Sequence, residues 1–389
     1  MEQEKIEQID TNQVILENPN KKNRKKLISN IIFLSLLTIL VFVLLFNIGD
    51  FEKIKNSFQN VGSNYQYFLI ALGLTLLYFI IWPFSQCIYS KAMKAEATIF
   101  ESYLIGCSEH FYNGITPFAA GGQPFQIYSY SKCHVKSAKG TGIILASFVT
   151  FMMVTNLFAL SSLLFYQELW DGLVNLDMQS TIVVAIIGIT LNFLVLLFMF
   201  ALGTSKKLRQ FMVNIVSKIV NWKLFHNPKR KLLFSFGNFL VKQVPAFEEY
   251  CTNAQIAFKE VFTHKKASLI ALLVKVIDMA FYYMVPFFLL KAVGIEIGYD
   301  KLVLVTFTTS FAINAVVWMP TPGATGGIEF AFMFSVAAAV GSKIDGAGVA
   351  LLWRLLTFYL TIILSFICNL ILEAHIRHKQ KKEESVKNV

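Results

Sequence analysis

Two stretches of the chain combine helix-breaking residues with polar side chains inside apolar sequence. Residues 116–125 read TPFAAGGQPF and residues 321–330 read TPGATGGIEF, so both fit the pattern T-P-x-x-x-G-G-x-x-F. Proline and paired glycines interrupt a helix and leave backbone groups free to meet a ligand. In a membrane protein, breaks at matching places in two halves indicate broken helices around a transport site. The pattern therefore predicts binding of a polar or charged group.

The second pattern lies close to two ionisable residues. Glu329 follows Gly326 and Gly327 at the predicted start of a half-helix, whose N–H groups suit an anion such as a lipid phosphate. The alternative is that Glu329 caps its own helix and that the glycines allow close packing. Arg354 lies about seven residues into the last apolar segment, where a cation needs a partner or a cavity. We hypothesise that Arg354 pairs with Glu329 until a lipid phosphate competes for it.

Four more ionisable residues lie in apolar sequence. Lys275 and Asp278 are spaced i,i+3, so on a helix they share a face and can neutralise each other. Alternatively, Asp278 faces the cavity and receives a cationic headgroup. Glu109 and His110 precede the first break, and histidine titrates near neutral pH, so a proton-coupled role is open. The blander alternative for His110 is a buried, hydrogen-bonded histidine.

Carboxamides accompany both breaks. Around Gly121 and Gly122, which let a headgroup approach the backbone, we expect headgroup hydrogen bonds from Asn113, Gln123 and Gln126, and near the second break from Asn314. Asn156 and Asn192 are predicted to bond between helices instead.

Enzyme signatures are missing from the sequence. It contains no H-E-x-x-H, no G-x-S-x-G and no Walker A lysine loop. The five cysteines are scattered, without C-x-x-C or a Cys/His cluster, so we expect neither a metal site nor a cofactor, and buried inert thiols.

The composition indicates which elements position these residues. Of the 389 residues, 55% are hydrophobic and 15% charged, and the mean hydropathy is +0.56. Several apolar runs reach the ~20 residues that a bilayer-spanning helix requires. We predict an all-α polytopic membrane protein with six full spans, at 28–48, 67–86, 142–166, 181–203, 267–292 and 347–373. Two further apolar regions, 98–130 and 302–340, each hold one copy of the repeated pattern.

The distribution of charge predicts the orientation of the spans. Basic residues precede the first span, follow the last, and dominate segment 205–266, which has twelve Lys/Arg against three Glu. The loops 49–66, 167–180, 291–301 and 341–346 together hold five Lys and eight acidic residues. By the positive-inside rule, these four loops lie outside and both termini lie in the cytoplasm. Region 98–130 then enters and leaves from inside, and region 302–340 from outside.

Two opposed re-entrant hairpins in an inverted-repeat arrangement follow from this orientation. The alternative is that each region forms two ordinary spans with a Gly/Pro kink. The predicted domains are a cytoplasmic tail, 1–27, a transmembrane domain, 28–373, and a second cytoplasmic tail, 374–389. Within the transmembrane domain, loop 205–266 alternates apolar and basic residues, which is typical of amphipathic helices on anionic lipid. Nucleic-acid binding is the weaker interpretation of the net charge of +11, because no recognised motif accompanies it.

Together these features resemble the transmembrane domain of the lysylphosphatidylglycerol synthase/flippase family. The matching residues are Thr116–Phe125 continuing through Gln126-Ile127-Tyr128, then Met319-Pro320-Thr321-Pro322-Gly323 with Gly326-Gly327-Ile328-Glu329, and Arg354. The resemblance covers about residues 30–373. It implies movement of an aminoacylated or anionic phospholipid, such as lysyl-phosphatidylglycerol, between the leaflets of a bacterial cell membrane.

The resemblance also leaves alternatives open. In the family a separate cytoplasmic domain transfers lysine from lysyl-tRNA to phosphatidylglycerol, which gives resistance to cationic antimicrobial peptides. The chain continues for only about sixteen residues after its last predicted span, so we expect a lipid transporter, served by a separate synthase chain, over a lysyltransferase. A carrier for a polyprenyl-phosphate sugar or glycolipid and a small-solute transporter remain alternatives. The headgroup, the coupling ion and the oligomeric state, including a homo-oligomer, stay open.

Overall fold

The computed structural model describes residues 59–116, 121–175, 181–221, 231–317, 327, 331–332, 336 and 346–387. The regular structure of these residues is helical throughout, which confirms the all-α prediction for the described part. The predicted tail 1–27 and the predicted span 28–48 lie outside the described residues. Of the second pattern, residues 321–330, only Gly327 is described.

Five segments in the described part are long and apolar enough to cross a membrane. They are Tyr65–Ala92, Ser137–Asp171, Ala185–Thr204, Lys265–Ala292 and Gly348–Glu383. Five of the six predicted spans therefore correspond to such helices. Helix α17 (Thr361–Lys387) continues beyond residue 373, so the described part of the predicted C-terminal tail is helical.

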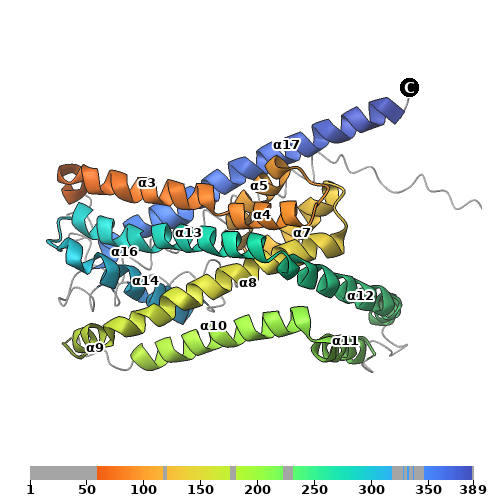
Figure 1. The fold of residues 1–389 in the computed structure, drawn as a ribbon, viewed down its shortest axis with the longest axis horizontal. Helices are drawn as coiled ribbons and strands as arrows, with labels where there is room; N and C mark the ends of the chain where they lie inside the picture. Colours follow the sequence, from red (N-terminus) through yellow and green to blue (C-terminus); the bar gives the residue numbers. More distant parts are fainter. Residues whose placement is uncertain are drawn as a thin grey trace, which may run out of the picture.

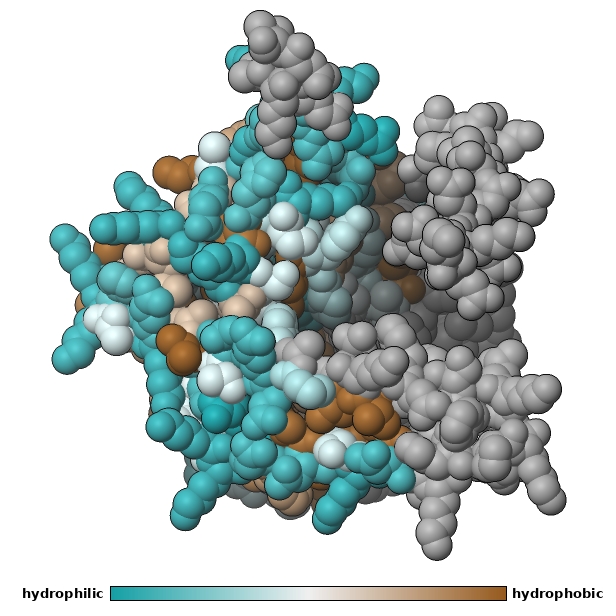
Figure 2. All heavy atoms as spheres, turned by 90° about the vertical axis from the view of Figure 1, so that its right-hand side faces the viewer, coloured by the Kyte–Doolittle hydropathy of each residue, from teal (hydrophilic) through white to brown (hydrophobic). Residues whose placement is uncertain are grey.

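The long helices run roughly along one direction and form a bundle (Figure 1). They are α3 (Tyr65–Ile81) with α4 (Phe84–Ala92), α8 (Ser137–Ser161), α10 (Thr181–Thr204), α13 (Lys265–Ala292), and α16 (Gly346–Arg354) with α17. Helix α9 (Tyr166–Asn175) and the start of α3 lie at the left-hand end of Figure 1, while α11 (Lys206–Val220) and the end of α17 lie at the right. Hydrophilic residues make up most of the described surface of the right-hand end (Figure 2).

Short helices connect the long ones on either side of the first repeated pattern. Helices α5 (Ile99–Cys107) and α6 (Glu109–Gly114) precede it, and α7 (Gly122–Lys132) follows it. Each has 6 to 11 residues, against the ~20 needed for a full span. Helix α14 (Leu302–Val316), with 15 residues, holds the equivalent place before the second pattern.

An internal repeat with an offset of 200 residues relates α4 to the end of α13. Helix α4 ends in a turn with Lys94 at φ 45°, and α13 ends in a turn with Gly294 at φ 85°. The same hydrogen bonds close both turns: Ala95 N to Ser90 O, and Ile295 N to Leu290 O. Figure 1 shows that the chain runs from left to right through α3 and α4 but from right to left through α13. The two copies of the repeat are therefore antiparallel.

The described parts of loop 205–266 are largely helical, as their spacing predicts, and the second helix also packs inside the bundle. Helix α11 exposes Lys206, Lys207 and Phe211, which fits an amphipathic helix at a lipid surface. Helix α12 (Lys231–Thr263) is one continuous helix, and its Phe258 and Val261 are fully buried in a hydrophobic cluster with residues of α8. The C-terminal part of α12 therefore packs on α8, while the side chains of residues 232–240, on which the prediction of a lipid-surface helix rests, lie outside the description.

Candidate functional site at the first broken helix

A proline kink divides the first described span at the centre of the site. Helix α3 ends at Ile81, and α4 begins at Phe84 after Trp82 and Pro83. Proline has no backbone N–H, so it interrupts the hydrogen-bond ladder of the helix. Gly106 of α5 lies against this kink so closely that a Cβ there would come 2.4 Å from Pro83 Cβ. The kink therefore determines where the first short helix packs.

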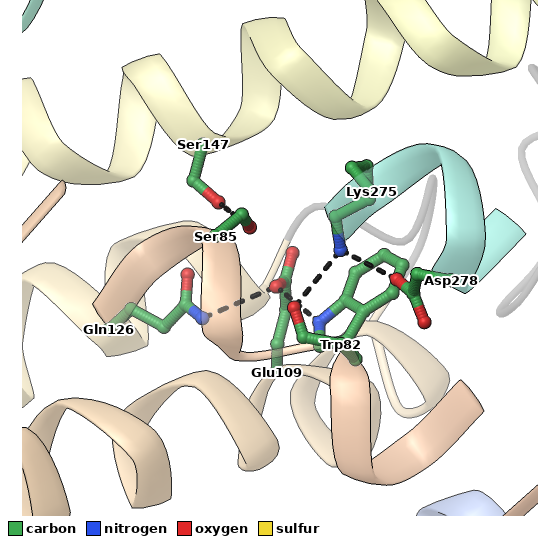
Figure 3. Close-up of polar contacts among 7 residues, drawn as sticks. All are labelled: Trp82, Ser85, Glu109, Gln126, Ser147, Lys275 and Asp278. Carbon is green, nitrogen blue, oxygen red and sulfur yellow. Dashed lines mark hydrogen bonds and ion pairs between the residues drawn. The ribbon is translucent and has the colours of Figure 1, made fainter. Parts of the chain in front are cut away.

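Lys275 and Asp278 of α13 form the ion pair that their spacing predicts. Lys275 Nζ lies 2.8 Å from Asp278 Oδ2, and the side chains are 2% and 0% exposed. The same ammonium donates to the Trp82 carbonyl at 3.0 Å and lies 3.9 Å from the centre of the Trp82 ring. Figure 3 shows Lys275 between Asp278 and Trp82. A buried ion pair needs such additional contacts to offset desolvation of its charges.

Glu109, at the start of α6, accepts four hydrogen bonds. Its Oε2 accepts from Trp82 Nε1 at 3.1 Å and from Gln126 Nε2 at 3.2 Å. Its Oε1 accepts from Gln123 Nε2 at 3.2 Å and from Asn113 Nδ2 at 3.4 Å. These donors come from the kink, from α6 and from α7, so one carboxylate joins three elements. Trp82 also connects Glu109 to the Lys275–Asp278 pair (Figure 3).

A chain of carboxamides fixes the position of Gln126. Its Nε2 donates to Gln86 Oε1 at 3.0 Å as well as to Glu109. Gln86 Nε2 in turn donates to the Tyr130 hydroxyl at 3.1 Å. Gln86, Gln126 and Tyr130 are all buried, so these bonds satisfy groups that would otherwise be costly at this depth.

The threonine and the two glycines of the repeated pattern hold α6 and α7 together in its first copy. Thr116 Oγ1 donates to Tyr112 O at 2.7 Å and accepts from Gly121 N at 2.8 Å. Gly122 N donates to Asn113 Oδ1 at 2.8 Å. A Cβ at Gly121 would lie 2.8 Å from Tyr112 O, and one at Gly122 would lie 2.6 Å from Asn113 Oδ1. The threonine and both glycines therefore allow α7 to begin directly beside α6.

His110 lies among aromatic rings. Its ring centre is 4.6 Å from that of Trp82, 5.5 Å from that of Tyr78 and 6.0 Å from that of Phe79. Its Nε2 is buried and has no hydrogen-bond partner among the described residues. His110 therefore packs as one ring of this aromatic cluster.

Asn314 of α14 and Asn192 of α10 bond to each other across two helices, as predicted for Asn192. Asn314 also donates to Ser310 O at 2.9 Å, so it joins helices, and the second break, at which we expect it to meet a headgroup, lies outside the described residues. The prediction for Asn156 is wrong, because its side chain donates to Met152 O of its own helix at 2.8 Å. An asparagine can satisfy itself against the preceding helical turn, and spacing alone does not exclude this.

Arg354 is 3% exposed and ends α16, where a turn of π-helix (Leu355–Leu360) begins. Its guanidinium carbon lies 4.5 Å from the centre of the Phe358 ring. Gly326 and Glu329 lie outside the described residues, and so does the hypothesised Arg354–Glu329 pair. Gly327 is helical and buried.

Comparison with known proteins shows the family to which this architecture belongs. Residues 31–365 match the family described as the lysylphosphatidylglycerol synthase TM region. The chain belongs to this family. It is also similar to a UPF0104 membrane protein of Archaeoglobus fulgidus, with 22% identity over 303 residues that cover 77% of this chain and 84% of the relative. No solved structure matches the chain.

The described site brings together predicted residues from distant parts of this family member. Glu109, Gln123 and Gln126 contact one another, and Trp82 connects them to Lys275 and Asp278. Sequence reasoning did not single out Trp82, Gln86 and Tyr130. The Trp82-Pro83 pair inside an apolar run could have indicated a kink there. Gln86 and Tyr130 carried no such signal, because their role depends on packing between α4 and α7.

Proposed function

We propose that this protein is a membrane lipid translocase that moves an aminoacylated or anionic phospholipid, such as lysyl-phosphatidylglycerol, between leaflets. The observation that carries the proposal is the cluster at the broken helix, in which Glu109 and its carboxamide partners adjoin the buried Lys275–Asp278 pair. Ionisable residues at membrane depth are costly, and they mark substrate and ion pathways. Membership of the family described as the lysylphosphatidylglycerol synthase TM region supports the proposed substrate class.

In the proposed mechanism the headgroup crosses along polar groups while the acyl chains remain in lipid. Helices α5 to α7 are too short to span the membrane separately, which supports a re-entrant hairpin that dips to the level of the α3–α4 kink. Region 302–340 would supply the opposing hairpin. Gln123, Gln126 and the Gly121-Gly122 backbone would then meet the headgroup from one side, with Arg354, Gly326, Gly327 and Glu329 on the other.

The proposed orientation places both termini and α11 in the cytoplasm of a cell whose envelope membrane holds the protein. The basic residues Lys206, Lys207 and Lys379 lie toward the right-hand end of Figure 1, on α11 and the end of α17. This charge distribution supports the assignment because cytoplasmic segments of membrane proteins are enriched in Lys and Arg. A substrate lipid synthesised in the cytoplasmic leaflet by a separate chain would then enter at this end.

The test is leaflet assignment of lysyl-phosphatidylglycerol in cells that carry a separate synthase, with and without this protein. A membrane-impermeant amine-reactive label reports the outer-leaflet lipid, and extraction gives total lipid. A translocase raises the outer-leaflet fraction at constant total. Replacing Arg354 by alanine should abolish that rise in a protein that still folds.

Two other outcomes would contradict this assignment. A rise in total lysyl-phosphatidylglycerol without a change in its leaflet ratio would indicate the lysyltransferase activity instead. No change in either quantity would remove this lipid as the substrate, and the same assay would then be repeated with labelled glycolipids.

A further inference from the structure

Neutral hydrogen-bond donors surround the Glu109 carboxylate. Each of its oxygens accepts two N–H groups, from Trp82 and Gln126 on one side and from Gln123 and Asn113 on the other. Among the described residues, no cation forms an ion pair with Glu109, since Lys275 is turned to Asp278. Glu101 of the same hairpin differs, because Lys379 Nζ lies 2.9 Å from it.

All four partners of Glu109 donate to it, which suits the ionised form of this carboxyl group. A carboxylate is an acceptor at both oxygens, whereas a carboxylic acid carries one O–H that itself needs an acceptor. Protonation would place that O–H against an N–H donor, so at least one of the four bonds must break, or one carboxamide must turn to present its oxygen. A buried donor left unpaired costs free energy. Proton binding therefore opposes the observed closed arrangement of the hairpin.

The carboxamide donors also come from two different helices, one on each side of the first break. Gln123 and Gln126 lie on α7, while Glu109 and Asn113 lie on α6. If α7 moves away from α6 to admit a headgroup, Glu109 loses two of its four donors. A carboxylate with fewer partners at membrane depth is strongly disfavoured. Uptake of a proton relieves this cost.

We propose that Glu109 is a proton-binding site which takes up a proton when α7 separates from α6, so that a proton gradient drives lipid movement. This inference rests on the proposed function. Glu109 accepts the proton from the side to which the hairpin opens, at whichever carboxylate oxygen loses its donors, and releases it to the opposite side when the four N–H groups close again. One proton is carried per hairpin opening, and no bond to carbon changes.

The groups that face Glu109 do not replace it in this role. Helix α13 contributes Lys275 and Asp278, which neutralise each other. Tyr78 of α3 packs against His110 of α6. Tyr130 of α7 is connected to Glu109 only indirectly, through hydrogen bonds of Gln86 and Gln126. Helix α17 packs uncharged residues, Ile362, Ser365 and Phe366, against the other face of α6. Glu109 thus accepts hydrogen bonds from both arms of the hairpin, α6 and α7.

The first experiment measures the steady-state leaflet ratio of lysyl-phosphatidylglycerol in vesicles of that lipid and phosphatidylglycerol. The membrane voltage is clamped at zero with potassium and valinomycin, and a pH difference is imposed. A carrier that moves one proton per lipid shifts the ratio by up to about tenfold per pH unit, since tenfold corresponds to about 1.4 kcal/mol. Glu109→Gln, which mimics the neutral form, should hold the ratio at unity. Glu101→Gln, a buried carboxylate with a lysine partner, should keep the gradient response.

A second measurement does not depend on transport by the variant. Infrared difference spectra of the wild type, with and without lysyl-phosphatidylglycerol, should show a protonated carboxyl band that is absent in Glu109→Gln and present in Glu101→Gln. If the wild type moves lipid but its ratio ignores the pH difference, or if no such band appears at any pH at which the protein stays folded, the inference is wrong and the translocase assignment stands. If no lipid moves, both fail together.

Discussion

At the level of single residues, the Lys275–Asp278 pair shows how the molecule tolerates charge at membrane depth. Both side chains are almost fully buried, and their charges are matched at 2.8 Å. The lysine makes two further contacts, with the carbonyl and the ring of Trp82. Either residue alone would be a buried, uncompensated charge, so the pair functions as a unit.

Lys275→Met tests this unit. Removal of the ammonium leaves Asp278 buried without its partner, so we expect a loss of about 3–5 kcal/mol in the free energy of unfolding. The double variant Lys275→Met/Asp278→Leu should recover most of that loss, because no charge remains to be desolvated. Denaturant unfolding of the purified protein in detergent, followed by tryptophan fluorescence, measures both. A double variant as unstable as the single one would contradict the argument.

Part of this residue-level arrangement could be predicted from the sequence, and part could not. The i,i+3 pairing of Lys275 with Asp278 follows from helix geometry alone. Its contact with Trp82 joins residues 193 positions apart, which local spacing does not determine. The same holds for Gln86 and Tyr130. Local patterns identified most of the chemistry-bearing side chains, and tertiary packing decided which of them meet.

At the level of elements, the hairpin formed by α5, α6 and α7 depends on close backbone contacts. Gly106 lies against Pro83 at the kink, with no room for a Cβ. The sequence predicted a break near Gly121 and Gly122 because proline and paired glycines punctuate a helix. It did not predict the separate kink at Trp82-Pro83, because a proline within an apolar span permits either a bend or a continuous helix.

Gly106→Ala tests that contact. A methyl group there would lie 2.4 Å from Pro83 Cβ and 3.0 Å from Pro83 Cα, neither of which can rotate away. We expect a loss of about 1–3 kcal/mol, as for other overpacked sites, and weaker protection of α5 from hydrogen exchange. Gly73→Ala on α3 is the matched control, because nothing lies within 4 Å of its added methyl group. Equal behaviour of the two variants would show that the kink does not hold α5.

Helix α17 holds the same hairpin from its far end. Lys379 Nζ lies 2.9 Å from Glu101 on α5, and Glu373 lies 3.2 Å from Lys132 on α7. Lys379→Ala should raise hydrogen exchange in α5 about fivefold, which corresponds to about 1 kcal/mol for a partly exposed partner. Lys382→Ala, on an exposed part of α17, should leave this exchange rate unchanged. An unchanged rate in Lys379→Ala would mean that α17 does not stabilise the hairpin.

At the level of the whole molecule, two equivalent turns 200 residues apart precede the two patterns, which begin 205 residues apart at Thr116 and Thr321. The turns at Lys94 and Gly294 have the same hydrogen bonds and similar positive φ values, and each leads into the short helices before one copy of the pattern. The repeat was visible in sequence only through the patterns themselves. The equivalence of the turns could not be predicted from sequence, because one left-handed position holds a lysine and the other a glycine, and a non-glycine residue is uncommon there.

The antiparallel course of the two copies predicts opposite sidedness for their equivalent turns. Glu96 and Glu296 are both exposed and follow the left-handed residue at the same distance. In a background without the native cysteines, Glu96→Cys should react with an impermeant thiol reagent only from the cytoplasmic side, and Glu296→Cys only from outside. The positive-inside rule sets this direction, and the chain path in Figure 1 sets the opposition. Reaction of both from one side would remove the inverted arrangement, and with it the argument that the two breaks approach one site from opposite faces of the membrane.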